Sequence, residues 1–291
     1  MEKFYITTPI YYVNDKPHIG HAYTTIVADV LARYWRAQIG EDNVYFLTGT
    51  DEHGAKIAEA AEAEGIEPQA FTDKVSQKFK DAWSNMEIDY NHFIRTTDKE
   101  HVKIITDILN TLKDKGVLYE DNYEGLYCVG CEKFITEGEL VDGKCPDHNK
   151  EPDNVTEKNW FFKLSDFLPK IKAAIESGEL AIYPESRKNE VLGLIDKQHV
   201  PDFSISRSKK SVPWGVDLPW DDDQKTYVWV DALSNYITAL DYPKGEDFKK
   251  YWPADAQFMA LDILKFHALY WPAILMALDL PMPKLYIHGF F

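Results

Sequence analysis

Apolar and polar positions follow a strand–helix–strand order over the N-terminal part of the chain. Residues 4–13 are β-branched and aromatic, which predicts a strand, and turn residues occupy positions 14–17. Residues 44–48 predict a second strand, and a helix after it ends near Gly65. Between the strands a helical pattern runs from His18 to about Gln38, with an apolar stripe of Ile19, Ala22, Tyr23, Ile26, Val30 and Tyr34. This order predicts a right-handed βαβ unit in a parallel sheet, which binds ligands at the carboxyl ends of its strands.

The pattern changes after Gly116. Helices predicted at 68–86 and 98–115 continue the first layer, whereas residues 117–160 contain many turns and all three cysteines. A strand pattern returns at 226–231, followed by a mostly apolar helix over 262–278, which Pro272 should bend, and a last strand at 285–288. We therefore predict an α/β domain in two halves, residues 1–115 and 226–291, interrupted by an insertion at 116–225.

Composition narrows the functional classes. The chain has 32 basic and 48 acidic residues in 291, a net charge of −16, which argues against a protein whose main task is to coat nucleic acid. The start lacks a signal-peptide pattern, and the uncharged run at 268–278 is shorter than the roughly 20 residues that a membrane span needs. Three cysteines are an odd number, which favours metal or free thiols over disulfides. We expect a cytoplasmic protein that does not enter the membrane.

The cysteines form a metal-ligand pattern. Two knuckles with the same two-residue spacing, Cys128–Cys131 and Cys145–His148, are separated by 13 residues. Three thiolates and one imidazole complete a tetrahedral zinc shell without an open position, which predicts a structural zinc ion that holds the insertion together. The alternative, three unrelated cysteines, is weaker because turn residues lie inside both knuckles.

A candidate phosphate site lies where the first strand meets the first helix. The backbone N–H groups at a helix N-terminus favour anions, and His18 and His21 can donate to phosphate oxygens there. Gly20 has no side chain, so a phosphate or a base can approach the backbone closely. The alternative is that both histidines are surface or N-cap residues of an amphipathic helix.

The stretch from Tyr11 to His21 resembles the first signature of the class I aminoacyl-tRNA synthetases, and the methionine–tRNA ligases in particular. The resemblance extends over nearly the whole chain, through residues 48–54, the zinc knuckles, and residues 183–190, 227–233 and 266–272. It implies a Rossmann-like catalytic domain interrupted by a zinc-binding connective-peptide insertion. The implied activity is the activation of L-methionine with ATP and Mg²⁺ to methionyl-adenylate, followed by transfer to tRNA(Met) in translation.

The resemblance also implies residue roles. His18 and His21 would stabilise the pentacoordinate phosphate, Gly20 and Asp262 would contact ATP, and Asp51 would bind the methionine ammonium group. For Asp51, a helix N-cap is the alternative role. The methionine side chain would lie among Pro9, Ile10, Tyr12, Trp229, Ala232, Leu233, Tyr236, His267 and Trp271. A polarisable thioether packs well against such aromatic rings.

The sequence departs from the family at two places. Ala260 and Leu261 replace the usual Gly-Lys before Asp262, and the sequence ends at Phe291, before the second signature, Lys-Met-Ser-Lys-Ser, and the helical anticodon-binding domain. Without these lysines we expect poor adenylate formation. One alternative is therefore a zinc-stabilised fragment that binds methionine or its adenylate without turnover.

Another alternative is a class I synthetase for a different amino acid. The valine and isoleucine enzymes carry a much larger editing insertion than residues 116–225 provide. The cysteine enzyme needs an open metal position for the substrate thiol, whereas the predicted shell here is closed.

Overall fold

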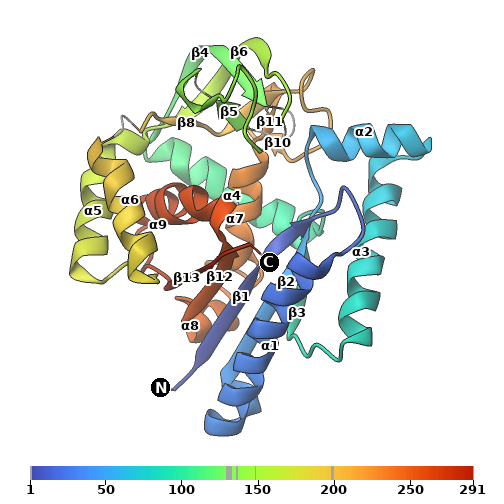
Figure 1. The fold of residues 1–291 in the computed structure, drawn as a ribbon, viewed down its shortest axis with the longest axis vertical. Coiled ribbons are helices and arrows are strands. Elements are labelled where there is room, and N and C mark those ends of the chain that lie inside the picture. The colour runs from blue at the N-terminus through green and yellow to red at the C-terminus, as the bar shows by residue number, and fades with distance from the viewer. Residues whose placement is uncertain (1, 129–132, 136, 148, 198–199, 291) are drawn as a thin grey trace.

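The core of the protein is a six-stranded parallel sheet (Figure 1). We describe the fold from a computed structural model, which covers residues 2–290 except 129–132, 136, 148 and 198–199. Every pair of neighbouring strands in this sheet is parallel, which confirms the predicted α/β class. In spatial order the strands are β3 (His92–Arg95), β2 (Val44–Asp51), β1 (Phe4–Tyr12), β12 (Ala256–Ala260), β13 (Leu285–His288) and β7 (Ile182–Tyr183).

Helices cover both faces of the sheet, because alternate residues of its strands bury apolar side chains on opposite sides. On one face, Phe4 and Ile6 of β1 pack with Ala28 and Ala32 of α1 (Ile19–Ile39). On the other face, Tyr5 belongs to the large core that includes α4 (Lys99–Asp114). The helices α2 (Ala55–Glu64) and α3 (Pro68–Asn85) form a smaller cluster around the end of β1.

The predicted apolar stripe of α1 faces outward, contrary to the orientation that an amphipathic helix favours. Five of its six side chains are exposed, up to 65% at Ile19 and 59% at Val30, and only Ala22 is partly buried. The buried face instead carries Ala28 and Ala32 together with two charged residues. Asp29 and Arg36 are tolerated there because the Asp29 carboxylate accepts from the backbone N–H of Asp89, and Arg36 donates to the carboxylate of Asp89 and to Asn91.

The segment 116–225 contains two small antiparallel sheets. One comprises β4 (Leu118–Cys128), β5 (Lys133–Ile135), β6 (Asp153–Phe162) and β8 (Phe203–Ser204), and the other β9 (Ser206–Ser208), β10 (Asp217–Leu218) and β11 (Asp221–Thr226). Figure 1 shows both above the carboxyl end of the parallel sheet. Between β6 and β8 along the chain lie α5 (Leu168–Ser177), β7 and α6 (Glu185–Lys197). Because β7 pairs with β13, part of this segment completes the parallel sheet.

Apart from Thr226, which ends β11, residues 226–231 do not form the predicted strand. They lead into the helix α7 (Val228–Thr238), where every residue except Trp229 is buried. The β-branched and aromatic residues of this run have a local preference for a strand. The packing of a helix that is buried on all sides outweighs this preference. The short helix α8 (Glu246–Tyr251) follows.

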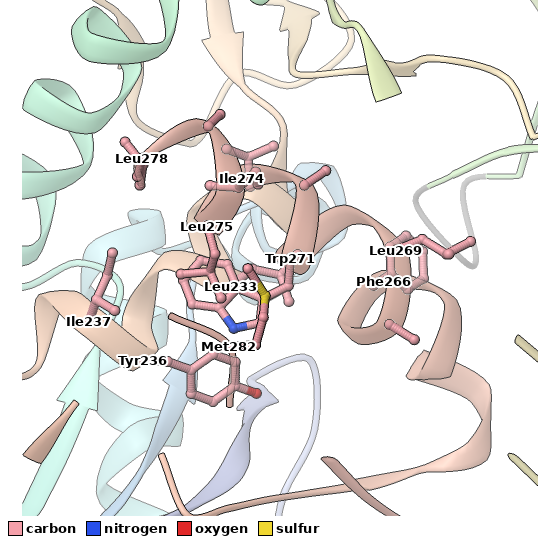
Figure 2. Close-up of a cluster of buried hydrophobic side chains, with 14 of the residues drawn as sticks. Leu233, Tyr236, Ile237, Phe266, Leu269, Trp271, Ile274, Leu275, Leu278 and Met282 are labelled. Carbon is pink, nitrogen blue, oxygen red and sulfur yellow. The ribbon is translucent and has the colours of Figure 1, made fainter. Parts of the chain in front are cut away.

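The helix predicted at 262–278 is interrupted. A strand, β12, precedes a 3₁₀ turn at Leu261–Ile263, and a π-helical turn at Phe266–Tyr270 leads into α9 (Trp271–Ala277). Pro272 has no N–H to donate to the carbonyl of residue 268, so a regular α-helix cannot continue through this point. Trp271 lies at the centre of a cluster formed by α7 and α9 (Figure 2). Within the described part of the chain, no helix combines the length and apolar character that crossing a bilayer requires.

Candidate active site

One cavity of about 850 Å³ opens at the carboxyl ends of β1, β2, β12 and β13. This is the edge at which a parallel sheet binds ligands. It brings together segments that are far apart in the sequence. The residues singled out by the sequence that line it are Pro9, Ile10, Tyr12, His18, Gly20, His21, Asp51, Trp229, Ala232, Leu233, Tyr236, Asp262 and His267. Trp271 does not line the cavity. It is fully buried, and its ring centroid lies 5.9 Å from that of Tyr236, which does line it.

His18 and His21 form the N-terminal cap of α1. The Nδ1 atom of His18 accepts from the backbone N–H of Gly20 at 3.1 Å, and Nδ1 of His21 accepts from the N–H of His18 at 3.3 Å. The two rings stack with centroids 3.6 Å apart. An imidazole that accepts at Nδ1 carries its proton on Nε2, so both neutral rings keep an Nε2–H donor. Capping, the alternative role, and donation to a ligand therefore use different atoms.

His21 is held neutral by its surroundings. Burial, and then the neighbouring ring of His18, lower the pKa of His21 from 6.5 to about 4. The absence of a side chain at Gly20 has a packing reason here. A Cβ at this position would lie 3.0 Å from Cε1 of His18, so a larger residue would displace the His18 ring.

Asp51 is the last residue of β2 and lies opposite Tyr12 of β1 in the register. Its alternative role as a helix N-cap is wrong, because α2 begins at Ala55 and Gly54 occupies the cap without a side-chain bond. The next residue, Glu52, is fully buried and accepts from Arg95 at 2.7 and 2.8 Å, in a bidentate pair. The backbone that presents Asp51 to the cavity is therefore anchored on one side by this ion pair.

Aromatic rings from α7 and the π-helical turn form the apolar wall. Trp229 stacks on Phe266 with centroids 3.8 Å apart and planes 5° apart. The hydroxyl of Tyr236 lies 2.7 Å from Nε2 of His267, and Nδ1 of His267 lies 3.0 Å from the carbonyl of Ile263. A carbonyl only accepts, so Nδ1–H donates to it and Nε2 accepts from Tyr236. Burial lowers the pKa of His267 to about 4, which agrees with a neutral ring.

The end of β12 carries the residues that depart from the family pattern. Ala260 lines the cavity next to Asp262, while Leu261 is partly buried against the main core. Burial raises the pKa of Asp262 above its usual value. His288, at the end of β13, is paired in the register with Ala260.

Several cavity residues were not predicted from the sequence. They include His288, whose Nε2 lies 2.9 Å from the hydroxyl of Thr24, and Phe266, Asn235 and Asp147. Sequence could have indicated His288, because it is the last residue of the last predicted strand, at the ligand-binding edge. Asp147 comes from the second cysteine knuckle, and no pattern at the sequence level places that turn beside the cavity.

Two of the four predicted zinc ligands lie in the described part of the chain. Cys128 and Cys145 are buried and belong to one small cluster with Ile135. After Cys145 the chain turns back, with the N–H of Asn149 donating to the Cys145 carbonyl at 2.8 Å. Cys131 and His148 lie outside the described residues. Among the described residues, no group of three or more potential ligands is assembled.

The chain matches known proteins over nearly its whole length. The family model described as tRNA synthetases class I (M) matches residues 4–157 and 148–291. The methionine–tRNA ligase of Clostridium acetobutylicum is 49% identical over 291 residues, which cover 99% of this chain and 45% of that protein. The methionine–tRNA ligase of Streptomyces coelicolor is 49% identical over 290 residues, which cover 96% of this chain and 53% of that protein.

Solved structures agree with these relatives. Mycobacterium tuberculosis methionyl-tRNA synthetase in complex with methionyl-adenylate superposes with a TM-score of 0.93 at 40% identity, covering 99% of this chain and 57% of that chain. The apo form of the same enzyme gives a TM-score of 0.84 at 37% identity, covering 99% and 56%. The chain spans about half the length of the relatives that it matches.

Proposed function

Since the chain belongs to the methionine type of class I tRNA synthetases, we propose that it binds L-methionine and ATP in the cavity and joins them as methionyl-adenylate. One observation carries this proposal. A buried carboxylate, an aromatic wall and the histidine-capped start of a helix face the same cavity, at the ligand-binding edge of the sheet. The relatives described above are methionine enzymes, so they do not favour another amino acid.

The two ends of methionine require different surroundings, and the cavity offers both. The Asp51 carboxylate suits the ammonium group as an ion pair. The stacked rings of Trp229 and Phe266 suit the thioether. Because the polar atoms of Tyr236 and His267 bond to each other, this wall offers little to a polar side chain. That favours methionine over polar amino acids of similar length.

Adenylate formation needs orientation and charge stabilisation rather than proton transfer. The methionine carboxylate is already ionised, and it attacks the α-phosphorus of ATP while pyrophosphate leaves. The Nε2–H groups of His18 and His21 and the N-terminus of α1 supply donors for the negative charge that grows on the phosphate. Asp262 would contact the ribose, and Mg²⁺ would enter with ATP.

We also propose a structural zinc ion in the insertion, held by Cys128, Cys131, Cys145 and His148. The two described thiols support it, because they lie at the starts of the two knuckles and are buried together in one small cluster. A closed thiolate–imidazole shell supplies folding energy rather than catalysis.

Transfer of the methionyl group to tRNA(Met) is the second half of the proposed function. The relatives that act on tRNA are about twice as long as this chain, so tRNA binding is proposed on family membership alone. The cytoplasm is the proposed compartment, on the grounds of cysteine usage.

Calorimetric titration with methionine, leucine and isoleucine, followed by methionine-dependent ATP–pyrophosphate exchange, tests the proposal. We expect binding of methionine only, and exchange that depends on it. Asp51→Asn, which preserves volume and removes the charge, should weaken methionine binding about 10- to 100-fold. Tighter binding of leucine or isoleucine would show that the amino acid is wrong. Binding of methionine without exchange would indicate a binding fragment instead of an enzyme.

A further inference from the structure

A buried chain of hydrogen bonds links three elements just outside the cavity. Nδ1 of His53, in the loop between β2 and α2, lies 2.7 Å from Oδ2 of Asp231 in α7. Nε2 of His101, in α4, lies 2.8 Å from Oδ1 of the same carboxylate. Nδ1 of His101 in turn lies 2.7 Å from the hydroxyl of Thr238. Since an ionised carboxylate only accepts, both imidazoles donate to Asp231.

The charge at the centre of this chain is strongly stabilised. Asp231 is 1% exposed and His101 is 2% exposed, so water contributes little to either group. Burial alone would raise the pKa of Asp231, but the two imidazoles outweigh it and lower the pKa to about 2. Removing either histidine would take away one of the two imidazole donors to this buried carboxylate, which would lower the free energy of unfolding.

The position of the chain relative to the cavity suggests its role. Neither His53, His101 nor Asp231 lines the cavity. On α7, Trp229 and Tyr236 face the cavity, whereas Asp231 and Thr238, seven residues apart, share the face that meets α4. The His53–Asp231 bond therefore connects the back of the aromatic wall to the loop that begins with Asp51.

Each of the three residues after Asp51, residues 52–54, is held by hydrogen bonds. The side chain of Glu52 is held by Arg95, and its backbone N–H donates to the hydroxyl of Thr96 at 2.9 Å. The backbone N–H of Gly54 donates to the carbonyl of Trp214 at 3.0 Å. Between these anchors, His53 makes the bond that ties the loop to α7.

We propose that His53 and Asp231 are positioning residues for the amino-acid substrate, because their bond sets the distance between the Asp51 carboxylate and the aromatic wall on α7. The inference rests on the proposed function, since it assumes that Asp51 and this wall hold the two ends of one molecule. His101 donates a hydrogen bond to the other oxygen of the same carboxylate but has no link to the Asp51 loop. His101→Ala is therefore a matched control for His53→Ala. Loss of the His53 bond should displace Asp51, and a displacement of about 1 Å in a binding group weakens substrate binding strongly. Loss of the His101 bond should leave Asp51 in place.

The test compares His53→Ala with His101→Ala, which removes the other bond to the same carboxylate. Both variants should lower the free energy of unfolding. Only His53→Ala should raise the KM for methionine, by about tenfold, with the KM for ATP within twofold of wild type. His53→Asn keeps a donor near the Nδ1 position and should recover methionine KM to within about threefold. In the ligand-free protein, the amides of Glu52 and Gly54 should exchange at least tenfold faster in His53→Ala and at the wild-type rate in His101→Ala.

Equal increases in methionine KM for the two alanine variants, or a parallel rise in both KM values, would overturn the inference in favour of a general structural role. Unchanged exchange at Glu52 and Gly54 would overturn it as well. If wild type itself neither binds methionine nor exchanges pyrophosphate, the proposed function fails, while the amide exchange still decides whether His53 positions the loop. If His53→Ala does not fold, His53→Asn and Asp231→Asn decide: only Asp231→Asn should raise the methionine KM.

Discussion

The hydroxyl of Tyr236 donates to Nε2 of His267 at 2.7 Å, and this bond joins α7 to the π-helical turn across the apolar wall of the cavity. Each group satisfies the other, so neither presents an unpaired polar atom to a bound side chain. The π-helical turn directs His267 towards Tyr236. The helix α9 begins directly after this turn, with Pro272 in its first turn. Together with the Trp229–Phe266 stack, this bond between residues 31 positions apart sets the geometry of the wall.

Tyr236→Phe should destabilise the protein and weaken methionine binding. It leaves the buried Nε2 of His267 without its donor, at a cost of about 1–3 kcal/mol in the free energy of unfolding, measured by urea denaturation. Tyr5→Phe is the control, because Tyr5 is equally buried and donates to the backbone carbonyl of Tyr236 at 2.7 Å but does not line the cavity. Only Tyr236→Phe should raise the methionine Kd. A similar rise in both variants would mean that the Tyr236–His267 bond has no special role.

His267 should make stability depend on pH. Burial lowers the pKa of His267 from 6.5 to about 4, so between these values the unfolded chain binds a proton that the folded protein does not. Its contribution is therefore complete above about pH 6.5 and is lost as the pH falls towards 4. Urea denaturation from pH 7 to 4.5 should show a steeper loss for wild type than for His267→Asn, by up to about 3 kcal/mol. Parallel curves would contradict a neutral, buried His267.

His21→Ala should reduce ATP–pyrophosphate exchange about 10²–10³-fold, because it removes one donor to the transition state. Since the pKa of His21 is about 4, its neutral Nε2–H donor is present throughout pH 6–8, and the wild-type rate should not change in that range through His21. His21→Gln retains a donor near Nε2 and should recover part of the rate. An exchange rate in His21→Ala equal to that of wild type would rule out the proposed role.

The sequence predicted the parallel sheet and the segments that line the cavity. It predicted the secondary structure of single segments less well. The sheet is confirmed, and β1, α1 and β2 begin and end close to their predicted limits, because strand and helix periods differ clearly there. Residues 226–231 were predicted as a strand, but residues 228–231 form the first turn of α7, because burial on all sides removes the polar face that identifies a helix. The role of Asp51 as a helix cap could be excluded only once α2 was seen to start at Ala55.

The orientation of α1 is the most direct failure of pattern reasoning. A stripe of large apolar residues normally faces the core, but here the core side needs small residues so that the helix can lie close to β1 and β2. We expect Val30→Glu to change the free energy of unfolding by less than about 0.5 kcal/mol, because Val30 is 59% exposed. Ala28→Glu, two residues away on the buried face, should cost several kcal/mol by burying an unpaired charge. Urea denaturation of both variants measures this, and the reverse order would mean that the stripe is buried.

Removal of zinc should loosen the insertion without dissolving the parallel sheet. Cys145 lies in a small cluster with Cys128 and Ile135, separate from the main core, so its loss should not propagate through apolar packing. We expect purified wild-type protein to contain one zinc ion by mass spectrometry of the metal, and Cys145→Ser to contain almost none, with faster amide exchange in β4 and β5. Exchange in β1 and β2 should stay at the wild-type rate. Asp147 connects this knuckle to the cavity, so ATP binding should weaken modestly in the same variant. Wild-type protein prepared without chelator and free of zinc would remove the metal proposal while leaving the proposed chemistry of the cavity intact.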